Sequence, residues 1–358
     1  MANGPLTFSL PMNPLRHLLA PLALPYWAGV KLRNAAYDAG VKQSQRVSLK
    51  TICVGNLTVG GTGKTPHTDY LLRLLLAQHR VGVLSRGYKR KTKGYIEANV
   101  DSTAQQVGDE PLQLKRRHPQ AVVAVEANRL AGIAAMQQAH PDLQVVLLDD
   151  AFQHRSITPG LSVLLTDFSR PIYTDHMLPW GSLRDSFAER LRADMVVVTK
   201  CPPNITREQM NNVAKRLRLQ PHQQLYFSTI AYGNLQPLVP TGQPMAMPPQ
   251  AAVLCGIARP QPLLNHLRQH TQLVGEFIFP DHHHFAKSEI IAIFERISAY
   301  GQHIPIITTE KDAARLMGLN LPEQIAQRIA YQEIAVQFVD HTQTEMFNKT
   351  ILHYVRED

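Results

Sequence analysis

Residues 51–65 read TICVGNLTVGGTGKT, and the expected fold follows from this stretch. Its beginning, Thr51 to Val54, predicts a buried strand, the part from Gly55 to Gly63 predicts a loop, and Lys64 predicts the start of a helix. A strand, a glycine-rich loop and a helix in this order form the context in which a phosphate-binding loop, or P-loop, occurs.

This loop has the residues that a triphosphate site needs. Glycines allow the backbone amides to turn inward, and the N-terminus of the following helix adds positive potential. In this pattern the Lys64 side chain reaches the β- and γ-phosphates, and the Thr65 hydroxyl ligates Mg²⁺. The residues predicted to bind the nucleotide are Gly60, Gly61, Thr62, Gly63, Lys64 and Thr65. Thr58 stands where the usual pattern has glycine, so an ordinary glycine turn before a helix is the alternative interpretation.

Short runs rich in Val, Ile and Leu recur along the chain. Their continuous hydrophobicity, rather than an alternation, is typical of parallel strands that helices cover on both faces. We therefore predict an α/β fold with a parallel P-loop NTPase sheet flanked by helices. The predicted strands are Thr51–Asn56, Val81–Ser85, Val122–Glu126, Val145–Asp149, Ser162–Thr166, Met195–Thr199, Ala251–Ile257, Val274–Phe279 and Ile304–Thr308.

Proline marks a boundary in the second half of the chain. Five prolines lie between Gly233 and Pro249, a composition that favours a linker or ribbon. We predict an N-terminal helical segment at 1–45, a P-loop core domain at 46–232, a linker at 233–249 and a smaller α/β domain at 250–358.

A pair of carboxylates ends one of the predicted strands, in the sequence VVLLDD at 145–150. A P-loop enzyme needs an acidic residue at the end of a neighbouring strand to hold its metal ion. Adjacent buried carboxylates are costly unless a cation or hydrogen bonds compensate them, although one of the two acids could instead cap the following helix. Gln153 and His154 follow within a turn and can reach the same ion or the acceptor.

Three more loops follow predicted strands and carry polar side chains. Arg86 can bind a phosphate and Tyr88 can stack on a sugar, while Arg129 offers a second basic group. Asp109 lies ahead of a predicted helix, where it either takes a proton from an attacking hydroxyl or simply starts the helix. Ligands of open α/β sheets gather at the carboxyl ends of the strands, so these loops are predicted to meet.

The sequence DHHH at 281–284 permits three interpretations. Clustered histidines suggest zinc, but adjacent positions seldom converge on one ion, and no acid or cysteine at ligand spacing completes a set. Asp281 or His282 could pair with a catalytic carboxylate when the two domains close, or the segment is a solvated loop. A rival function, a metallochaperone GTPase, would use this cluster for metal and Thr199-Lys200 to read guanine, although Asp does not follow Lys200.

The segment Leu18–Val30 is apolar and has basic neighbours, but it is shorter than the roughly 20 residues that span a bilayer. It contains Pro21 and Pro25, and no signal-peptide cleavage site stands out after it. One interpretation is a monotopic helix in the headgroup region of an anionic membrane surface. The other is a helix packed on the protein's own core.

The composition limits the class of partner. The chain of 358 residues has 37 Lys and Arg against 28 Asp and Glu, a net charge of +9 that favours anionic partners. No interleaved basic and aromatic repeat indicates a nucleic-acid binder. The three cysteines form no CxxC motif, which favours a reducing compartment. Nothing in the sequence indicates the oligomeric state.

Six motifs in this order resemble the tetraacyldisaccharide 4′-kinase family of lipid A synthesis. The motifs are GNLTVGGTGKTP at 55–66, SRGY at 85–88, GDEP at 108–111, DDAFQH at 149–154, LPWGSLRD at 178–185 and FPDHH at 279–283. The likeness covers nearly the whole chain, and Thr58 is usual for this family. The resemblance implies an ATP-dependent kinase that phosphorylates the 4′-hydroxyl of a tetraacyldisaccharide 1-phosphate and yields lipid IVA. It also implies Mg²⁺, and a peripheral or monotopic location at the cytoplasmic face of a Gram-negative inner membrane.

The same resemblance implies roles for individual residues. Lys64 and Thr65 would hold the nucleotide and the metal, and Lys64 would also be catalytic. The residues implied near Mg²⁺ are Thr65, Asp150, Gln153 and Asp185. Asp109 would be the catalytic base with His282 as its partner. The residues implied to face the lipid headgroup are Arg86, Tyr88, Arg129 and His154.

One position departs from the family pattern. The family usually has Glu followed by Pro where this chain has Asp185 and Ser186. A side chain one methylene shorter would bind the metal through water, so the role implied for Asp185 is the one that this sequence supports least.

Overall fold

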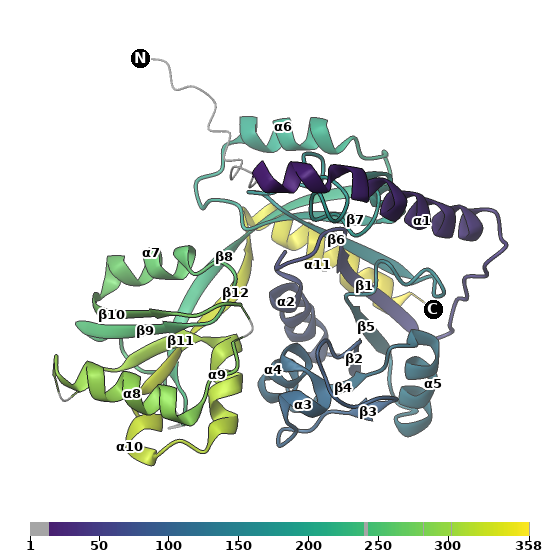
Figure 1. Cartoon of the computed structure of the whole chain (residues 1–358). Helices are drawn as coiled ribbons and strands as arrows, with labels where there is room; N and C mark the ends of the chain where they lie inside the picture. The colour runs from purple at the N-terminus through teal and green to yellow at the C-terminus, as the bar shows by residue number, and fades with distance from the viewer. Residues whose placement is uncertain (1–13, 240–242, 282, 302, 358) are drawn as a thin grey trace.

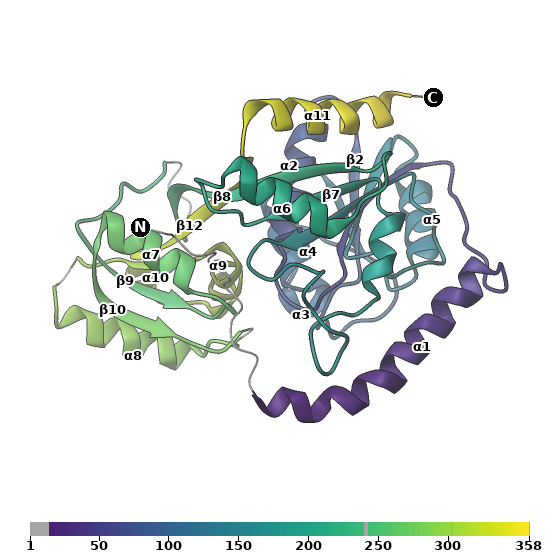
Figure 2. The same ribbon diagram turned by 90° about the horizontal axis from the view of Figure 1, so that it is seen from above.

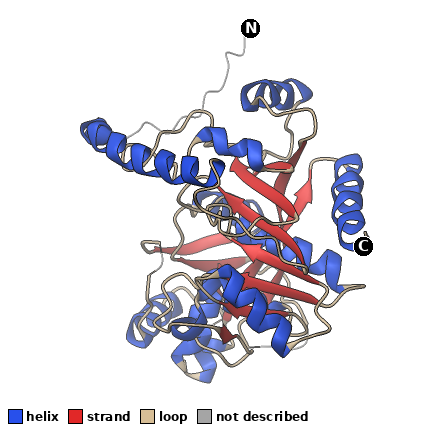
Figure 3. Ribbon diagram, turned by 90° about the vertical axis from the view of Figure 1, so that its right-hand side faces the viewer, coloured by secondary structure: helices blue, strands red, loops and turns tan. Residues whose placement is uncertain are grey.

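The computed structural model describes residues 14–239, 243–281, 283–301 and 303–357. Within them a twelve-stranded, mostly parallel sheet runs through the whole molecule, with helices on both faces (Figures 1 and 3). The strand order is β10-β9-β11-β12-β8-β7-β6-β1-β5-β2-β4-β3. The predicted α/β class is therefore confirmed, and the sheet, predicted as parallel, is mostly parallel with antiparallel pairs at β8–β12 and β3–β4.

The bounds of the strands agree with the sequence patterns wherever a strand is apolar throughout. All nine predicted strands are present and each bound lies within two residues of the predicted one. The strands are β1 (Lys50–Asn56), β2 (Val81–Ser85), β3 (Ile96–Glu97), β4 (Val122–Val125), β5 (Val145–Asp149), β6 (Leu161–Asp167), β7 (Met195–Thr199), β8 (Gln224–Pro237), β9 (Gln250–Cys255), β10 (Gln272–Ile278), β11 (Ile306–Thr309) and β12 (Ile329–Phe338).

Helices cover the sheet because alternate residues of its central strands point to opposite faces. In β1, Ile52 and Val54 join one buried cluster with α2 and α11, whereas Cys53 joins the cluster under α5 and α6. The helices are η1 (Pro14–Leu19), α1 (Ala20–Asp38), α2 (Lys64–Leu76), α3 (Ala104–Val107), α4 (Asp109–Arg117), α5 (Arg129–Ala139), η2 (Phe187–Arg192), α6 (Arg207–Leu217), α7 (Gln261–His270), α8 (Lys287–Ser298), α9 (Glu310–Leu316), η3 (Met317–Leu319), α10 (Glu323–Ala326) and α11 (His341–Arg356).

Two units share this sheet. The large unit consists of β1 to β7 and the helices on them, and the small unit consists of β9, β10 and β11 with α7 to α10 (Figure 1). The antiparallel pair β8 and β12 runs from one unit into the other. The stretch 233–249, predicted as a linker, thus begins as part of β8.

The C-terminal helix also differs from the expected grouping. The predicted smaller domain spans 250–358, but α11 returns to the large unit, where Phe347, Ile351 and Val355 join its core. Tyr70 of α2 donates a hydrogen bond to Asn348 at 2.8 Å. An amphipathic helix does not reveal from its sequence which of two cores it covers.

Helix α1 lies along the edge of the molecule, as Figure 2 shows from above. Several of its apolar side chains face solvent: Leu24 is 67% exposed and Leu32 is 74% exposed. Its buried residues are Ala23 and Asn34. No helix in the described part of the chain combines the length and the apolar character needed to cross a bilayer.

Candidate active site

The glycine loop between β1 and α2 has a closely braced backbone. Gly60 and Gly63 have φ angles of +98° and +88°, a region that favours glycine, and Gly63 is the residue before α2. The Thr199 hydroxyl donates to the Thr62 carbonyl at 2.8 Å, and the Lys200 ammonium donates to the Gly61 carbonyl. Lys200 also lies 3.1 Å from Asp167, so it braces this loop, a role different from the guanine-reading one of the rival interpretation.

The departure at Thr58 has a structural reason. Thr58 forms an isolated antiparallel bridge with Leu183, and the neighbouring Val59 amide donates to the Ser182 carbonyl at 2.8 Å. Arg184 donates its amide to the Leu57 carbonyl at 2.7 Å. The first half of the loop is therefore extended and paired with residues 182–184, a conformation that needs no glycine at position 58.

Lys64, Asp150 and Arg184 meet beside the loop. Lys64 Nζ lies 3.7 Å from Asp150 Oδ1, and the Arg184 guanidinium forks onto both oxygens of Asp150 at 2.7 and 3.1 Å. Burial alone would raise the pKa of Asp150, but Lys64 and Arg184 outweigh it and lower the pKa to about 2. Asp150 is therefore ionised at neutral pH.

Asp149, the other carboxylate at the end of β5, has a different environment. Its side chain is 1% exposed, and burial, then Glu110 and Asp150, raises its pKa to about 7. Thr68 donates a weak hydrogen bond to it at 3.4 Å. The two adjacent acids therefore have opposite pKa shifts, because nearby cations outweigh burial at Asp150 but not at Asp149.

The available donor atoms fit Mg²⁺. Gln153 donates through Nε2 to the Asn56 carbonyl at 2.7 Å, while its Oε1 is buried without a hydrogen-bond partner among the described residues. Mg²⁺ prefers oxygen ligands and is commonly held by one or two carboxylates together with phosphates. The described residues contain no group of three His, Cys, Asp or Glu side chains placed to hold a metal by themselves.

Asp185 has partners other than those expected. It is fully buried, and its carboxylate accepts hydrogen bonds from Asn34 at 2.8 Å and from Arg33 at 3.2 Å, both on α1. The predicted metal ligand is therefore bound by protein donors on both oxygens, and Arg184, the residue before it, contacts Asp150 instead.

The residues expected to face the headgroup are two arginines, a tyrosine and a histidine, and they lie at different depths. Arg129 is 1% exposed, and it donates to the carbonyls of Glu126 at 2.6 Å and Asp149 at 3.3 Å. Burial, then the charges of Arg129 and Arg86, lowers the pKa of His154 to about 4. Tyr88 is 65% exposed. Arg86, Arg129 and His154 thus share one electrostatic environment, with Tyr88 at the surface beside it.

Asp109 is the first residue of α4 and lies next to the loop that carries Tyr88. A Cβ atom on Gly108 would lie 3.1 Å from the Tyr88 carbonyl, and the φ of Gly108 is +92°, so this close approach needs glycine. Arg315 of α9 forms an ion pair with Asp109 Oδ2 at 2.7 Å. Arg315 also donates to the fully buried Asp312 at 2.8 Å and to the Gly256 carbonyl at 3.4 Å. His282, the predicted partner of Asp109, lies outside the described residues.

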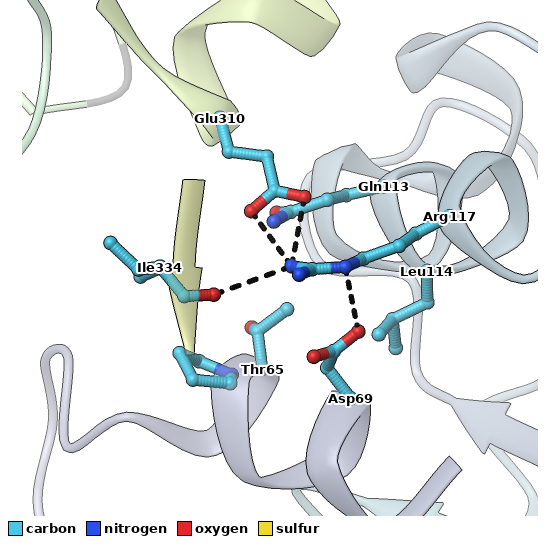
Figure 4. A pocket seen from close by; sticks show the side chains of 8 residues that line it. Thr65, Asp69, Gln113, Leu114, Arg117, Glu310 and Ile334 are labelled. Atoms are coloured by element: carbon cyan, nitrogen blue, oxygen red, sulfur yellow. Dashed lines mark hydrogen bonds and ion pairs between the residues drawn. The ribbon is translucent and has the colours of Figure 1, made fainter. Parts of the chain in front are cut away.

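A second contact between the units lies beneath the phosphate loop. Arg117 of α4 contacts Asp69 of α2 at 3.1 Å and Glu310 of α9 at 3.1 Å, and it donates to the Ile334 carbonyl of β12 (Figure 4). A cavity of about 10 Å³ remains there, lined in part by Thr65. The helix that follows the glycine loop is therefore tied to both units.

Sequence comparisons now identify the family. The profile of the family described as LpxK, tetraacyldisaccharide-1-P 4′-kinase, matches residues 15–355. The chain belongs to this family. The tetraacyldisaccharide 4′-kinase of Bacteroides thetaiotaomicron is 44% identical over 95% of this chain and 93% of that protein. The enzyme of the same name from Flavobacterium johnsoniae is 39% identical and covers 97% of this chain and 99% of its own.

The fold comparison agrees. A crystal structure described as the "apo" form of LpxK from Aquifex aeolicus in complex with ATP has a TM-score of 0.74 and 25% identity, and it covers 95% of this chain and 99% of its own. The predicted resemblance to the tetraacyldisaccharide 4′-kinases, and with it the prediction of a kinase, is confirmed.

Three polar residues of this kinase were not assigned from sequence. Asn56 is fully buried, accepts from the Arg184 guanidinium and donates to the Thr62 hydroxyl at 2.8 Å. Arg184 was part of the quoted motif but had no assigned role, although its position directly before an implied metal residue was a usable signal. Arg315 lies 206 positions from Asp109, and no local pattern indicates that pairing.

Proposed function

We propose that this protein transfers the γ-phosphate of ATP to the 4′-hydroxyl of a tetraacyldisaccharide 1-phosphate and so forms the 1,4′-bisphosphorylated lipid A precursor. The observation that carries this proposal is the convergence of Lys64 and Asp150, 3.7 Å apart, at a glycine loop in a chain of this kinase family. A P-loop whose lysine faces a strand-end carboxylate is the arrangement that binds a nucleotide with its metal ion.

The nucleotide site is assigned to the loop from Gly60 to Thr65. Its amides and the N-terminus of α2 bind the phosphates, and Lys64 neutralises charge that builds on the transferred group. The Thr65 hydroxyl, Asp150 and the Gln153 amide oxygen would hold Mg²⁺, which supplies charge neutralisation to the phosphates when bound. We do not assign Asp185 to direct metal binding, because Arg33 and Asn34 occupy its oxygens.

Asp109 is proposed as the base that accepts the proton of the 4′-hydroxyl. It stands at the start of α4, where Arg315 fixes the direction of its carboxylate. His282 would share the proton, as acid–base pairs do. Asp109 and Arg315 belong to different units, so this pair forms only when the small unit lies against the large one.

The acceptor is proposed to bind over Arg86, Tyr88 and His154. The positive charges of Arg86 and Arg129 that lower the pKa of His154 suit the phosphate of a disaccharide 1-phosphate. Arg129 contributes from below, since it is buried and bonded to backbone carbonyls. The exposed leucines of α1 are proposed to enter the headgroup region at the cytoplasmic face of the inner membrane.

The test is an assay with purified protein, labelled ATP and the disaccharide 1-phosphate lipid in detergent. Transfer of label to the lipid in the presence of Mg²⁺, and its absence with a metal chelator, is the expected result. A protein that binds ATP but never labels the lipid would contradict the proposal, and so would equal labelling of a disaccharide already phosphorylated at the 4′ position.

A further inference from the structure

We propose that Asn34 and Arg33 of α1 are positioning residues of the metal site, through which the helix that carries the exposed leucines completes the binding site for Mg²⁺. The inference rests on the proposed function, because it concerns the same metal site. It concerns residues far from the glycine loop in sequence, and it follows from three sets of contacts between α1 and the loops that carry Arg184 and Gln153.

The first set of contacts involves the buried carboxylate of Asp185. Asn34 Nδ2 donates to Oδ1 at 2.8 Å, Arg33 Nη2 donates to Oδ2 at 3.2 Å, and the Ser186 amide donates to Oδ1 at 2.9 Å. Asp185 has no exposed surface, and Asn34 is 4% exposed. A buried carboxylate requires such donors, so loss of α1 from this place would leave an unpaired charge and force the 182–186 loop to move.

The second set concerns Arg184, the neighbour of Asp185. Its guanidinium forks onto Asp150 and also contacts Asn56, whereas its own carbonyl accepts a hydrogen bond from Tyr26 of α1 at 3.1 Å. A bidentate contact between a guanidinium and a carboxylate depends on orientation as well as on distance. Helix α1 thus fixes the backbone of the residue that orients Asp150.

The third set reaches the loop after β5. Arg155, two residues after Gln153, donates to the Asn34 carbonyl at 3.1 Å and pairs with Asp38 at the end of α1 at 2.5 Å. One helix therefore contacts both loops that border the predicted metal site. Groups that orient metal ligands without touching the metal commonly contribute as much as a tenfold to hundredfold change in affinity.

The opposite half of α1 is exposed and apolar. Leu22 is 58% and Leu24 67% exposed, and Trp27 is 40% exposed, while Leu18 of the preceding η1 is 74% exposed. A helix with such a surface gains free energy by lying in a membrane interface. Asn34 lies on the same helix, about three turns after Leu24. The position of α1 on the membrane and the geometry of the metal site are therefore coupled.

The experiment measures binding of Mn²⁺, as a spectroscopic substitute for Mg²⁺, to the full chain with a non-hydrolysable ATP analogue in detergent micelles. Asn34→Ala and Arg33→Ala are expected to weaken Mn²⁺ binding by about 10-fold or more. Tyr26→Phe, which removes one hydrogen bond from a partly exposed position and leaves the fold intact, is expected to weaken it by a few-fold. Arg33→Lys should restore part of the affinity lost in Arg33→Ala.

Lys31→Ala is the matched control, since it removes a positive charge from the same helix at a residue whose contact is the Trp27 ring. It should leave the Mn²⁺ affinity unchanged. If Asn34→Ala, Arg33→Ala and Tyr26→Phe all bind Mn²⁺ as tightly as Lys31→Ala does, the coupling is refuted. This outcome is distinct from failure of the proposed function, which would appear as a wild-type protein that binds the metal and nucleotide but does not phosphorylate the lipid.

Discussion

The carboxylates of Asp150 and Asp109, both proposed to belong to the active site, are held in different ways. The contacts of Asp150 come from Lys64 and Arg184, both in the large unit. Asp109 belongs to the large unit, but Arg315 of the small unit binds it. The proposed nucleotide contacts therefore lie within one unit, whereas the proposed base is bound by a residue of the other unit.

This difference separates the two tasks of a phosphotransferase. A site built within one rigid unit can bind ATP before the acceptor arrives. A base that a second unit orients depends on the contact between the two units, so damage to that contact should lower the rate of transfer. Variants of the two regions should accordingly differ in whether they change affinity for nucleotide or only the rate.

Lys64→Ala should give the largest change. Loss of its charge at the phosphates is expected to lower kcat by roughly 10³-fold and also to weaken nucleotide binding. Steady-state kinetics together with calorimetric titration of an ATP analogue checks both effects. A variant that keeps its affinity for nucleotide would contradict the role of Lys64 in nucleotide binding.

His67 of α2 contacts the glycine loop, and its protonation tests how strongly the fold stabilises this region. Its Nδ1 lies 2.7 Å from the Gly63 carbonyl and its Nε2 3.0 Å from the Ser228 hydroxyl, and burial lowers its pKa from 6.5 to about 4. Between these values the unfolded chain takes up a proton that the folded protein does not. The free energy of unfolding should therefore fall by about 3 kcal/mol as the pH drops from about 6.5 to about 4, and the loss should stop below that range.

The measurement for His67 is urea unfolding at several pH values. His67→Gln should be less stable than the wild type at neutral pH, and the gap between the two proteins should narrow on acidification. A gap that stays constant between pH 7 and pH 4 would show that His67 is not kept neutral by the fold.

Asp109→Asn tests the proposed role of Asp109 as the base. The amide cannot accept the hydroxyl proton, so kcat should fall by roughly 10²-fold or more, while affinity for the ATP analogue changes little. Single-turnover kinetics at saturating lipid separates chemistry from binding. Near wild-type turnover would remove Asp109 from the role of base.

Arg315→Ala should have the smallest effect of this series. Without the guanidinium, Asp109 keeps its chemistry but loses its orientation, so kcat should fall by about 10-fold with nucleotide affinity unchanged. Arg315→Lys should recover only part of the rate, because a lysine cannot fork between Asp109 and Asp312.

Arg268→Ala is the control for Arg315→Ala, since it removes a surface pair with Glu276 in the same unit, with both side chains at least one-third exposed. Its kcat should match that of the wild type. Equal losses in the two variants would mean that Arg315 contributes only to the stability of the small unit.

The sequence was sufficient to predict the strands that are buried along their whole length. Strands such as β2 and β5 are buried along their whole length, so each reads as an unbroken apolar run with clear ends. Strands β8 and β12 were not predicted, because they are partly exposed and pass between two units, and the pairing of β12 with β8 shifts its register at Ile334. Their patterns are neither continuous nor alternating.

The site was predictable to the extent that its residues are neighbours in the chain. The glycine loop and the Asp149-Asp150 pair lie beside strand ends, where local pattern and topology together indicate a function. The partners of Asp185 and Asp109 lie 151 and 206 positions away, and no periodicity links them. Only the folded arrangement shows that Asp185 holds α1.

The pairing of Phe338 with Ser228 has a consequence for how this enzyme is put together. These residues face each other where β8 and β12 leave the large unit, and α11 then completes the core that β1 began. The chain between them is thus an insert within a hairpin, and its two ends are already adjacent. We expect that replacing residues 229–337 with a short turn would leave a folded large unit whose glycine loop still binds a nucleotide, while Asp109 loses the contact with Arg315.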